Sequence, residues 1–423
     1  MTTKILVNSK DLSNIFAPYV SGTKASTTNF LVNNNDLSNI FAPYISGTKA
    51  ENTNILVNNN DLSNIFSKKA KTTFNIGFTG LGAYPINTIY LNGKIYCTGR
   101  FTNVVYNGVS TVVSNGSSHI IVSWNPSTTT WTLIGTCNGT TQINTIYSSP
   151  SENSFYIGGS FSSINSLSMT RIAKYNTLTS TWSAFTNPFV NQIFKLERYG
   201  NIFYSLVQAD GIGYYYNTSW NSIPGTLYSA ANGTGTGTPQ IFAINQSNGI
   251  YYMSGNFASA NNGTQEQIYN YLLKYDPSTN KISPVPNSNS TLNGAAVGIS
   301  GTAQAMIIIN DILYVGANAY VSGGNTFFNA YNTITGVWSS PNSQFNAAVR
   351  SFYYYNNVLY IGGNFTTSTA GATRFIVAWD LANTWTPITV TTAITTYVTS
   401  ITYDPNLGTV YTGVNAGIGI TTG

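Results

Sequence analysis

The sequence is poor in charge and in the residues that build metal and nucleophilic sites. Only 7% of its 423 residues are Asp, Glu, Lys or Arg, against about 25% in an ordinary soluble domain, and His119 is its one histidine. A single imidazole cannot supply a copper centre or a His-Cys zinc cluster, and a Ser-His-Asp triad and a Gly-x-x-x-x-Gly-Lys phosphate loop are also missing. The sequence therefore predicts no metal, no cofactor and no catalytic residue.

Cysteines and long apolar runs are scarce as well. Cys97 and Cys137 are too few for a disulfide framework, and whether the two pair is left open. No stretch approaches about eighteen consecutive apolar residues, and the N-terminal MTTKILVNSKDL lacks the apolar segment of a signal peptide. We therefore expect synthesis in the cytoplasm without a signal peptide, and no insertion into a membrane.

Basic residues show no pattern suited to nucleic acid. Lys and Arg number 17 against 12 Asp and Glu, and apart from Lys68, Lys69 and Lys71 they are scattered, so no stripe could follow a phosphate backbone. Nucleic acid is not an expected partner. Gly, Thr, Ser, Asn and Tyr are abundant instead, a composition that favours strands and turns and predicts an all-β fold.

The first 70 residues contain three copies of one 25-residue unit. They read KILVNSKDLSNIFAPYVSGTKA from residue 4, NFLVNNNDLSNIFAPYISGTKA from residue 29 and NILVNNNDLSNIF from residue 54. In each copy an extended apolar triplet precedes an aspartate whose carboxylate can cap a short helical turn, namely Asp11, Asp36 or Asp61. The pattern predicts a repeat of short strands and helical turns.

Each helical turn would show an apolar face that so small a unit cannot bury alone. It must stack on neighbouring units or on copies from other chains. We therefore predict that residues 1–72 form a stalk for anchoring and oligomerisation. The side chains expected to associate into a homo-oligomer are Leu12, Ile15, Phe16, Leu37, Ile40, Phe41, Leu62, Ile65 and Phe66.

A longer and looser repeat follows. Its first mark is an apolar–Tyr–apolar–Gly–Gly segment, as in SFYIGGSF from residue 154 and VLYIGGNF from residue 358. Its second mark is a tryptophan near the end of the unit. Five of the seven tryptophans share this position: Trp131, Trp182, Trp220, Trp338 and Trp385.

Each unit of this repeat has the layout of a propeller blade, with four short β-like runs between Asn-Gly, Asp-Pro or Thr-rich turns. Glycines in the second run let neighbouring blades approach closely, and the large aromatics fill the wedge between diverging sheets. We predict that residues 73–423 form a seven-bladed β-propeller, with six blades as the alternative. Phe74–Gly80 is expected to pair with the C-terminal strands, which closes the ring and removes free sheet edges.

Two family resemblances accompany these patterns. The Tyr-Ile-Gly-Gly-Asn-Phe and Lys-Tyr-Asn-x-x-Thr-x-x-Trp motifs resemble kelch and galactose-oxidase-type propellers over residues 74–423. The N-terminal unit resembles tandem repeats in structural proteins of giant double-stranded DNA viruses of protists. The second resemblance implies a virion surface or fibre protein, made in the host cytoplasm, whose partners are other capsid or fibre proteins. Galactose-oxidase-type copper chemistry needs more imidazoles than this chain has.

A carbohydrate-active enzyme is the catalytic alternative. It would act through two carboxylates, for which the residues left over after the caps and turns are Glu152, Glu197, Asp210 and Glu266.

A binding role is favoured by where the long connections lie. In an up-and-down blade, the second-to-third and the blade-to-blade connections share one face, and the long segments, such as residues 102–119, all belong to this group. Loops on a rigid scaffold often carry recognition, although drift in loop length is the alternative. The binding residues predicted on this face are Tyr106, His119, Tyr228, Asn262 and Tyr320.

The sequence thus predicts a non-enzymatic virion surface, fibre or decorating protein. Its propeller head would present a binding face to a host receptor, a glycan or a neighbouring subunit. The alternative in another class is an intracellular scaffold propeller that binds a protein partner.

Overall fold

The computed structural model divides the chain into two compact units, residues 1–73 and 74–423. In the first unit it describes six two-residue strands. In the second unit it describes residues 76–80, 87–114, 116, 118–138, 142–185, 191–207, 211–216, 219–222, 226–228, 237–261, 266–268, 271–292, 295–297, 299, 301–317, 327–341, 345–368, 371–372, 375–388, 397–414 and 417–422. Apart from the single 3-10 turn η1 (Pro150–Glu152), the regular elements of these residues are strands, which confirms the all-β class.

The first unit contains one short hairpin in each sequence repeat. In each pair an apolar residue lies opposite the repeat's aspartate, as Leu6 does opposite Asp11. The helical turns predicted after these aspartates lie outside the described residues. The hairpins are β1 (Leu6–Val7) with β2 (Lys10–Asp11), β3 (Leu31–Val32) with β4 (Asn35–Asp36), and β5 (Leu56–Val57) with β6 (Asn60–Asp61).

Seven sheets of the second unit repeat one antiparallel order, and among the described strands six of them have four strands and the last has three. Sheet 1 contains β8 (Asn87–Leu91), β9 (Lys94–Gly99), β12 (Ile120–Asn125) and β13 (Thr130–Thr136). Sheet 2 contains β14 (Ile143–Ser149), β15 (Ser154–Gly159), β18 (Ile172–Asn176) and β19 (Thr181–Ala184). Sheet 3 contains β20 (Ile193–Tyr199), β21 (Ile202–Val207), β22 (Gly211–Tyr216) and β23 (Ser219–Ser222).

The remaining four sheets follow the same pattern. Sheet 4 contains β25 (Thr238–Ile244), β26 (Tyr251–Asn256), β29 (Leu272–Asp276) and β30 (Lys281–Pro284). Sheet 5 contains β33 (Ala303–Ile309), β34 (Ile312–Ala317), β35 (Phe328–Asn332) and β36 (Trp338–Ser339). Sheet 6 contains β37 (Val349–Tyr355), β38 (Val358–Gly363), β41 (Ile376–Trp379) and β42 (Trp385–Pro387). Sheet 7 contains β43 (Val398–Asp404), β44 (Thr409–Val414) and β45 (Gly417–Thr422).

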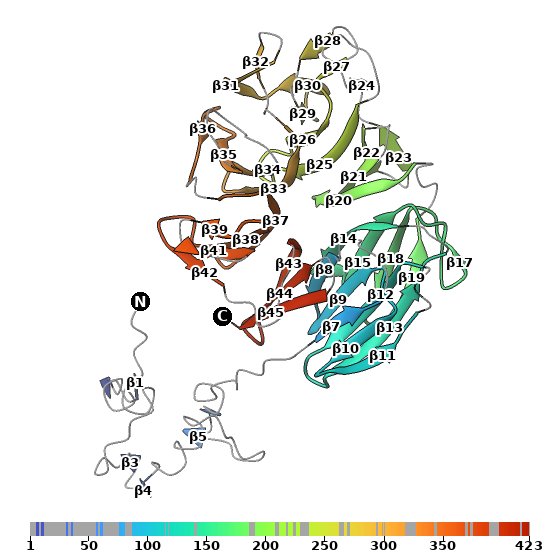
Figure 1. Ribbon diagram of the computed structural model, residues 1–423, viewed down its shortest axis with the longest axis vertical. Coiled ribbons are helices and arrows are strands. Elements are labelled where there is room, and N and C mark those ends of the chain that lie inside the picture. The colour runs from blue at the N-terminus through green and yellow to red at the C-terminus, as the bar shows by residue number, and fades with distance from the viewer. Residues whose placement is uncertain are drawn as a thin grey trace. The chain divides into compact units, whose positions relative to one another are not determined.

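The first strand of every sheet lies at the centre of the unit (Figure 1). We call these strands, β8, β14, β20, β25, β33, β37 and β43, the inner strands. Each contacts the inner strand of the next sheet, and β43 contacts β8, so that the order returns to its start. The sheets are therefore arranged around a common axis.

Glycines in the second strands allow this close approach. A Cβ added to Gly158 would lie 2.6 Å from Cγ2 of Ile193 in the next inner strand, and one added to Gly316 would lie 2.6 Å from Cγ1 of Val349. Such separations are well inside van der Waals contact, so a side chain at these positions would push neighbouring sheets apart. The close-approach role predicted for the glycines is confirmed.

Two tryptophans at the repeated position, Trp182 and Trp338, donate to the preceding sheet or to the segment that follows it. The Nε1–H of Trp182 in sheet 2 donates to the backbone oxygen of Ile134 in sheet 1, at 3.2 Å. Trp338 in sheet 5 donates in the same way to Pro286 O at 2.7 Å. The ring of Trp182 packs on Tyr175 and Phe155 of its own sheet, so it fills the space between two sheets, as predicted.

Side-chain hydrogen bonds join the first and last inner strands. The Tyr90 N–H donates to Thr402 Oγ1 at 2.8 Å, and the hydroxyls of Thr88 and Ser400 lie 3.1 Å apart. Each of these pairs is separated by 312 residues in the sequence. The two ends of the second unit are thus held together at its centre.

The segment expected to close the ring from outside has another hydrogen-bonded partner. β7 (Ile76–Thr79) lies against β45, but its registered antiparallel partner is β10 (Asn103–Tyr106), which pairs in turn with β11 (Val109–Val112). Phe78 of β7 stacks on Phe101 with ring centroids 3.9 Å apart. Pairing of Phe74–Gly80 with the C-terminal strands therefore stays a prediction, and the hydrogen-bonded closure in the structure lies between β8 and β43.

Hairpins inserted between the second and third strands contact the chain where it leaves the preceding sheet. In sheet 2 the hairpin of β16 (Ser163–Ile164) and β17 (Leu167–Ser168) bridges from Ile164 to Cys137, just beyond β13. Asn138 Oδ1 accepts from the N–H groups of Ser162 and Ser163. Asn346 Oδ1 accepts in the same way from the N–H groups of Thr366 and Thr367, at the start of the hairpin of β39 (Thr367–Ser368) and β40 (Gly371–Ala372).

A similar hairpin belongs to sheet 4. It consists of β27 (Ser259–Asn261) and β28 (Glu266–Ile268), and β27 pairs with β24 (Thr226–Tyr228), which follows sheet 3. After sheet 4 the chain forms one more hairpin, β31 (Pro286–Leu292) with β32 (Ala295–Val297). Several long connections are therefore built against a neighbouring sheet.

Replacing Gly362 by Ala tests the close approach. A Cβ at this position would lie 2.5 Å from both Ser351 Oγ and Val398 Cγ1. We expect a loss of about 1–3 kcal/mol in the free energy of unfolding, measured by urea denaturation, because the core would be overpacked. The control is Gly77→Ala, where nothing lies within 4 Å and a change below about 1 kcal/mol is expected. Equal losses in the two variants would contradict the interpretation.

Candidate functional site

Six inner strands carry a β-bulge at the same position. In β14 the register with β15 shifts between Ile143 and Thr145, which leaves Asn144 without an opposite residue. The extra residue of a bulge interrupts the alternation of side chains and redirects them locally. Corresponding shifts occur in β20, β25, β33, β37 and β43. The six bulged residues, which we call the bulge ring, are Asn144, Phe194, Gln240, Gln304, Arg350 and Thr399.

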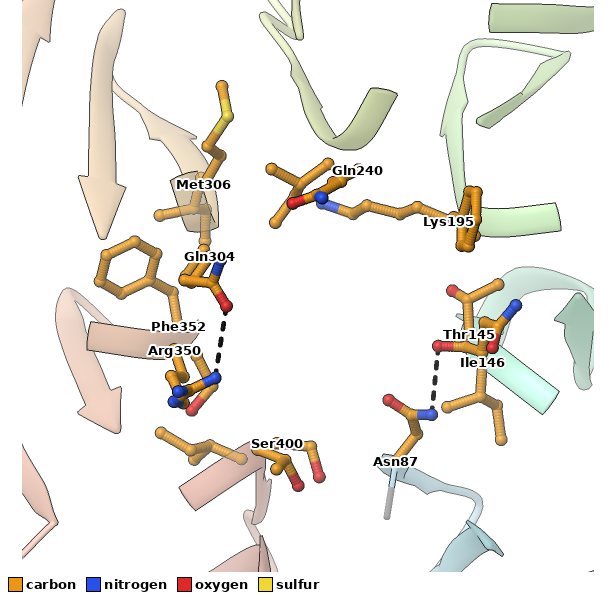
Figure 2. Close-up of a pocket in the computed structure, with 18 of the residues that line it drawn as sticks. Asn87, Thr145, Ile146, Lys195, Gln240, Gln304, Met306, Arg350, Phe352 and Ser400 are labelled. Carbon is orange, nitrogen blue, oxygen red and sulfur yellow. Dashed lines mark hydrogen bonds between the residues drawn. The ribbon is translucent and has the colours of Figure 1, made fainter. Parts of the chain in front are cut away.

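All members of the bulge ring line one cavity at the centre of the sheets. Its volume is about 400 Å³, within the range of small-molecule sites. Figure 2 shows side chains from several sheets directed around this space, with Gln240, Gln304 and Arg350 among them. A bulge at one position of the repeat thus places one side chain from each of six sheets around a common cavity.

The bulge ring lies at the end of the sheets that carries the long connections. Its members stand at the beginning of their strands, and the second strand of each sheet ends opposite them. At this end β9 stops at Gly99 and β12 starts only at Ile120, whereas at the other end β33 stops at Ile309 and β34 starts at Ile312. The cavity therefore shares the end of the sheets where the predicted binding loops attach.

Two of the three charged residues that line the cavity neutralise one another. Lys195 Nζ lies 2.6 Å from Glu197 Oε1 and also donates to the backbone oxygen of Phe242 at 2.6 Å. Both side chains are less than a quarter exposed. This pair connects sheets 3 and 4 beside the cavity and adds no net charge to its lining.

Arg350 is the third charged residue, and it contacts the neutral side chains of Asn364, Gln304 and Tyr397. Its Nε–H donates to Asn364 Oδ1 at 2.5 Å and its Nη1–H donates to Gln304 Oε1 at 3.3 Å. The guanidinium carbon lies 4.7 Å from the ring centroid of Tyr397, a cation–π contact. Figure 2 shows Gln304 and Arg350 joined across neighbouring sheets.

Asparagine side chains connect the inner strands beside the cavity. Asn87 Nδ2 donates to the backbone oxygen of Asn144 at 3.2 Å, and Asn144 Nδ2 donates to that of Ile193 at 2.7 Å. Because the amide nitrogens face the neighbouring strand, the amide oxygens are left as acceptors. In Figure 2 the oxygen of Asn87 is turned toward the cavity.

His119, predicted on the binding face, lies in the interior. Only 2% of its surface is exposed, and its Nδ1 accepts the N–H of Ile143, directly before the bulge at Asn144. Burial, together with the charge of Arg100, lowers the pKa of His119 to about 4. The ring is therefore neutral at pH 7 and supports the start of β14.

The other predicted site residues divide into one packed residue and several that are not described. Tyr106 is half-buried in β10, with its ring centroid 5.1 Å from that of Trp124. Tyr228 belongs to β24, but its side chain lies outside the described residues, as do Asn262 and Tyr320. The described structure does not bring the five together. Outside the described residues also lie Leu12, Ile15, Phe16, Leu37, Ile40, Phe41, Leu62, Ile65 and Phe66.

Glu152, one of the carboxylates considered for catalysis, is held between two sheets. It accepts from Tyr156 and Arg198, and from Lys174 at 2.9 Å. Burial opposes ionisation of this carboxyl, but the three donors outweigh it and lower the pKa of Glu152 to about 2. Glu152 is therefore ionised in the physiological range and cannot serve as a general acid. The side chains of Asp210 and Glu266 lie outside the described residues.

The two cysteines are buried and unpaired. Burial raises the pKa of Cys137 to about 12 and also raises that of Cys97, so neither thiol is a reactive thiolate at neutral pH. Within the described residues no group of three or more His, Cys, Asp or Glu side chains could hold a metal ion. No helix in this part of the chain is long and apolar enough to cross a membrane.

The bulge ring was missed by sequence reasoning. A bulge is a shift in pairing, and pairing is not visible in one strand alone. A signal was nevertheless present, because the inner strands begin with similar short runs, such as IN in INTIY, AQ in AQAMI and VR in VRSFY. The polar second residue of each of these runs is the one that stands at the bulge.

Comparison with known proteins shows similarity in fold alone. No family model and no curated protein matches the sequence. An extracellular domain from B. thetaiotaomicron is 13% identical with a TM-score of 0.51, and the match covers 83% of this chain and 40% of that one. A chain of a mitotic checkpoint complex is 12% identical with a TM-score of 0.52, and the match covers 87% of this chain and 98% of that one. This chain thus spans less than half of the extracellular domain.

His119 should make stability fall on mild acidification. Its pKa of about 4 lies below the ordinary value of 6.5, so between these values the unfolded chain takes up a proton that the folded chain refuses. We expect a loss of up to about 3 kcal/mol between pH 6.5 and 4 that is reduced in His119→Asn, which keeps an acceptor but cannot ionise. The measurement is urea unfolding across this pH range. If the free energy of unfolding changed equally with pH in both proteins, His119 would not be the source of the loss.

Glu152 should make the stability of the fold depend on pH at more acidic values. Its folded pKa of about 2 lies below the ordinary value of 4.5, so its stabilisation is complete above pH 4.5 and is lost as the pH falls toward 2. We expect Glu152→Gln to be less stable at pH 7 by about 1–3 kcal/mol, with a smaller further loss on acidification. Tyr156→Phe, which removes one hydrogen-bond donor and keeps the ring, should lose less stability than Glu152→Gln. Thermal unfolding between pH 7 and 2 measures both, and an unchanged acid profile in Glu152→Gln would exclude the role.

Proposed function

We propose that residues 74–423 form a seven-bladed β-propeller. The proposal is supported by seven sheets of one strand order, whose inner strands contact one another in sequence, with the last contacting the first. Sheet 7 has three described strands, and β7 lies against its outermost strand β45. A fourth strand for the last blade is therefore available at the N-terminal end of the unit.

The function that this geometry supports best is non-enzymatic binding. The observation that carries the proposal is the polar cavity bounded by the bulge ring, which shares one end of the sheets with the long connections. Rigid sheets that present loops and a cavity on one face are suited to recognition. Two of the carboxylates considered for catalysis, Glu152 and Glu197, are each held by cations, which supports this proposal.

We place this binding protein on the surface of a large virus particle. The support is the resemblance of the N-terminal repeats to those of giant-virus structural proteins. In this proposal residues 1–72 anchor the chain and associate with other copies or with capsid and fibre proteins. The head would then meet a host receptor, a glycan or a neighbouring subunit.

The second candidate is an intracellular scaffold that binds one protein partner. The exposed apolar residues Val109 and Val112 on β11 favour it, since an exposed β edge can receive a strand from another protein. Co-purification of the chain with a single intracellular protein from infected cells would support this candidate over the first.

The virion proposal is tested by quantitative mass spectrometry of purified particles and of soluble extract. We expect the chain to be enriched in particles, and expect Phe16→Ser, Phe41→Ser and Phe66→Ser together to abolish this enrichment, because they remove the apolar faces of the repeats. The matched control carries Asn8→Ser, Asn33→Ser and Asn58→Ser in the same repeats and should stay in the particles. Recovery of the unchanged chain only in soluble extract would overturn the proposal.

A further inference from the structure

Arg350 differs from every other member of the bulge ring. The residues at the five corresponding positions are Asn144, Phe194, Gln240, Gln304 and Thr399, all uncharged. The bulge in β37 places the guanidinium on the wall of the central cavity. A charged side chain at a repeated position otherwise occupied by neutral residues suggests a role that the fold itself does not require.

The guanidinium is fixed in direction before any ligand arrives. Asn364 Oδ1 and Gln304 Oε1 hold Nε and Nη1, and the ring of Tyr397 supports the guanidinium plane at 4.7 Å. These contacts restrict a side chain that otherwise loses much rotamer entropy on binding. A pre-oriented donor set makes a binding site more effective.

The charge of Arg350 is not neutralised within the described structure. No carboxylate of the described residues lies within salt-bridge distance of it, whereas Lys195 in the same cavity pairs with Glu197 and Arg198 elsewhere pairs with Glu152. The cavity lining therefore carries one net positive charge. An anion with a single negative charge would balance it, and guanidinium groups bind carboxylates through two parallel hydrogen bonds.

The rest of the lining is suited to hydroxyl groups and to an apolar ring face. The amide oxygens of Asn87 and Asn144 are acceptors, since their nitrogens are engaged by neighbouring strands. Phe194 and Phe352 contribute aromatic surface to the same cavity. Acceptors need donors on the ligand, and a sugar supplies several hydroxyl groups whereas hydrogen phosphate supplies only one. A volume of about 400 Å³ accommodates a small molecule.

We propose that the central cavity binds an acidic monosaccharide, with its carboxylate on Arg350 and its hydroxyls on the amide oxygens of Asn87 and Asn144. The carboxylate takes the outward-facing donors of the guanidinium, and Gln304 and Asn364 keep the remaining ones in place. This inference rests on the proposed binding role of the cavity and names its ligand, and it is independent of whether the chain resides on a virus particle.

The test uses the full chain and titrates it with D-glucuronate, D-glucose, N-acetyl-aspartate and inorganic phosphate by ligand-observed NMR at one ionic strength. We expect D-glucuronate to bind at least about tenfold more tightly than D-glucose, because only the former has the carboxylate. D-glucuronate should also bind more tightly than N-acetyl-aspartate, which lacks the hydroxyls. Tighter binding of phosphate, or equal binding of the two sugars, would overturn the proposal.

Variants then locate the site. Arg350→Gln should weaken the binding of D-glucuronate to the level of D-glucose. Arg350→Lys, which keeps the charge without the planar donor pair, should weaken the binding of D-glucuronate about three- to tenfold. The matched control is Lys281→Gln, which removes one positive charge at an exposed position on β30. It should bind as the unchanged protein does. Full D-glucuronate affinity in Arg350→Lys, or equal losses in Lys281→Gln and an Arg350 variant, would place the ligand elsewhere.

Discussion

The close approach of consecutive inner strands is the constraint on which the rest of the structure depends. Seven sheets can share one axis only if each second strand leaves room for the next inner strand, and Gly158, Gly316 and Gly362 leave that room by having no side chain. Away from the axis the sheets diverge, and tryptophans such as Trp182 fill the widening space. Small residues near the centre and large ones at the periphery are therefore two consequences of one geometry.

The same constraint produces the cavity. The inner strands surround the axis, and a bulge at the start of six of them interrupts the alternation of side chains beside the cavity that they line. The bulge ring thus combines a structural role with a chemical one, since the amide nitrogen of Asn144 connects two sheets and its oxygen remains as an acceptor for a ligand. Arg350 alone among its members brings a charge, so the ring is uniform in backbone and asymmetric in chemistry.

Sequence patterns predicted the parts of the fold that repeat. The all-β class, the glycines at close approach and the inter-sheet tryptophans follow from residue types at fixed positions, whereas blade number stays a proposal. Strand pairing was harder to predict, because a strand's sequence does not say which neighbour it pairs with. β7 lies against β45, but its registered partner is β10. The site was not predicted for the same reason, since a bulge is a relation between strands. His119 was considered for the binding face because exposure cannot be read from one residue, and burial at the start of β14 explains its place.

Closure between β43 and β8 is the central claim, and an engineered cross-link tests it most directly. Thr88 and Ser400, whose hydroxyls lie 3.1 Å apart, are replaced by cysteine, and the oxidised monomer is digested and mapped by mass spectrometry. The account predicts a disulfide between positions 88 and 400 within one chain, with a higher unfolding temperature, because the link closes a loop of more than 300 residues. Because Cys97 lies opposite position 88 in the registered pair of β8 and β9, the test is made with Cys97→Ala in the same protein. Thiols that stay reduced, or that link only between chains, would contradict a closed ring.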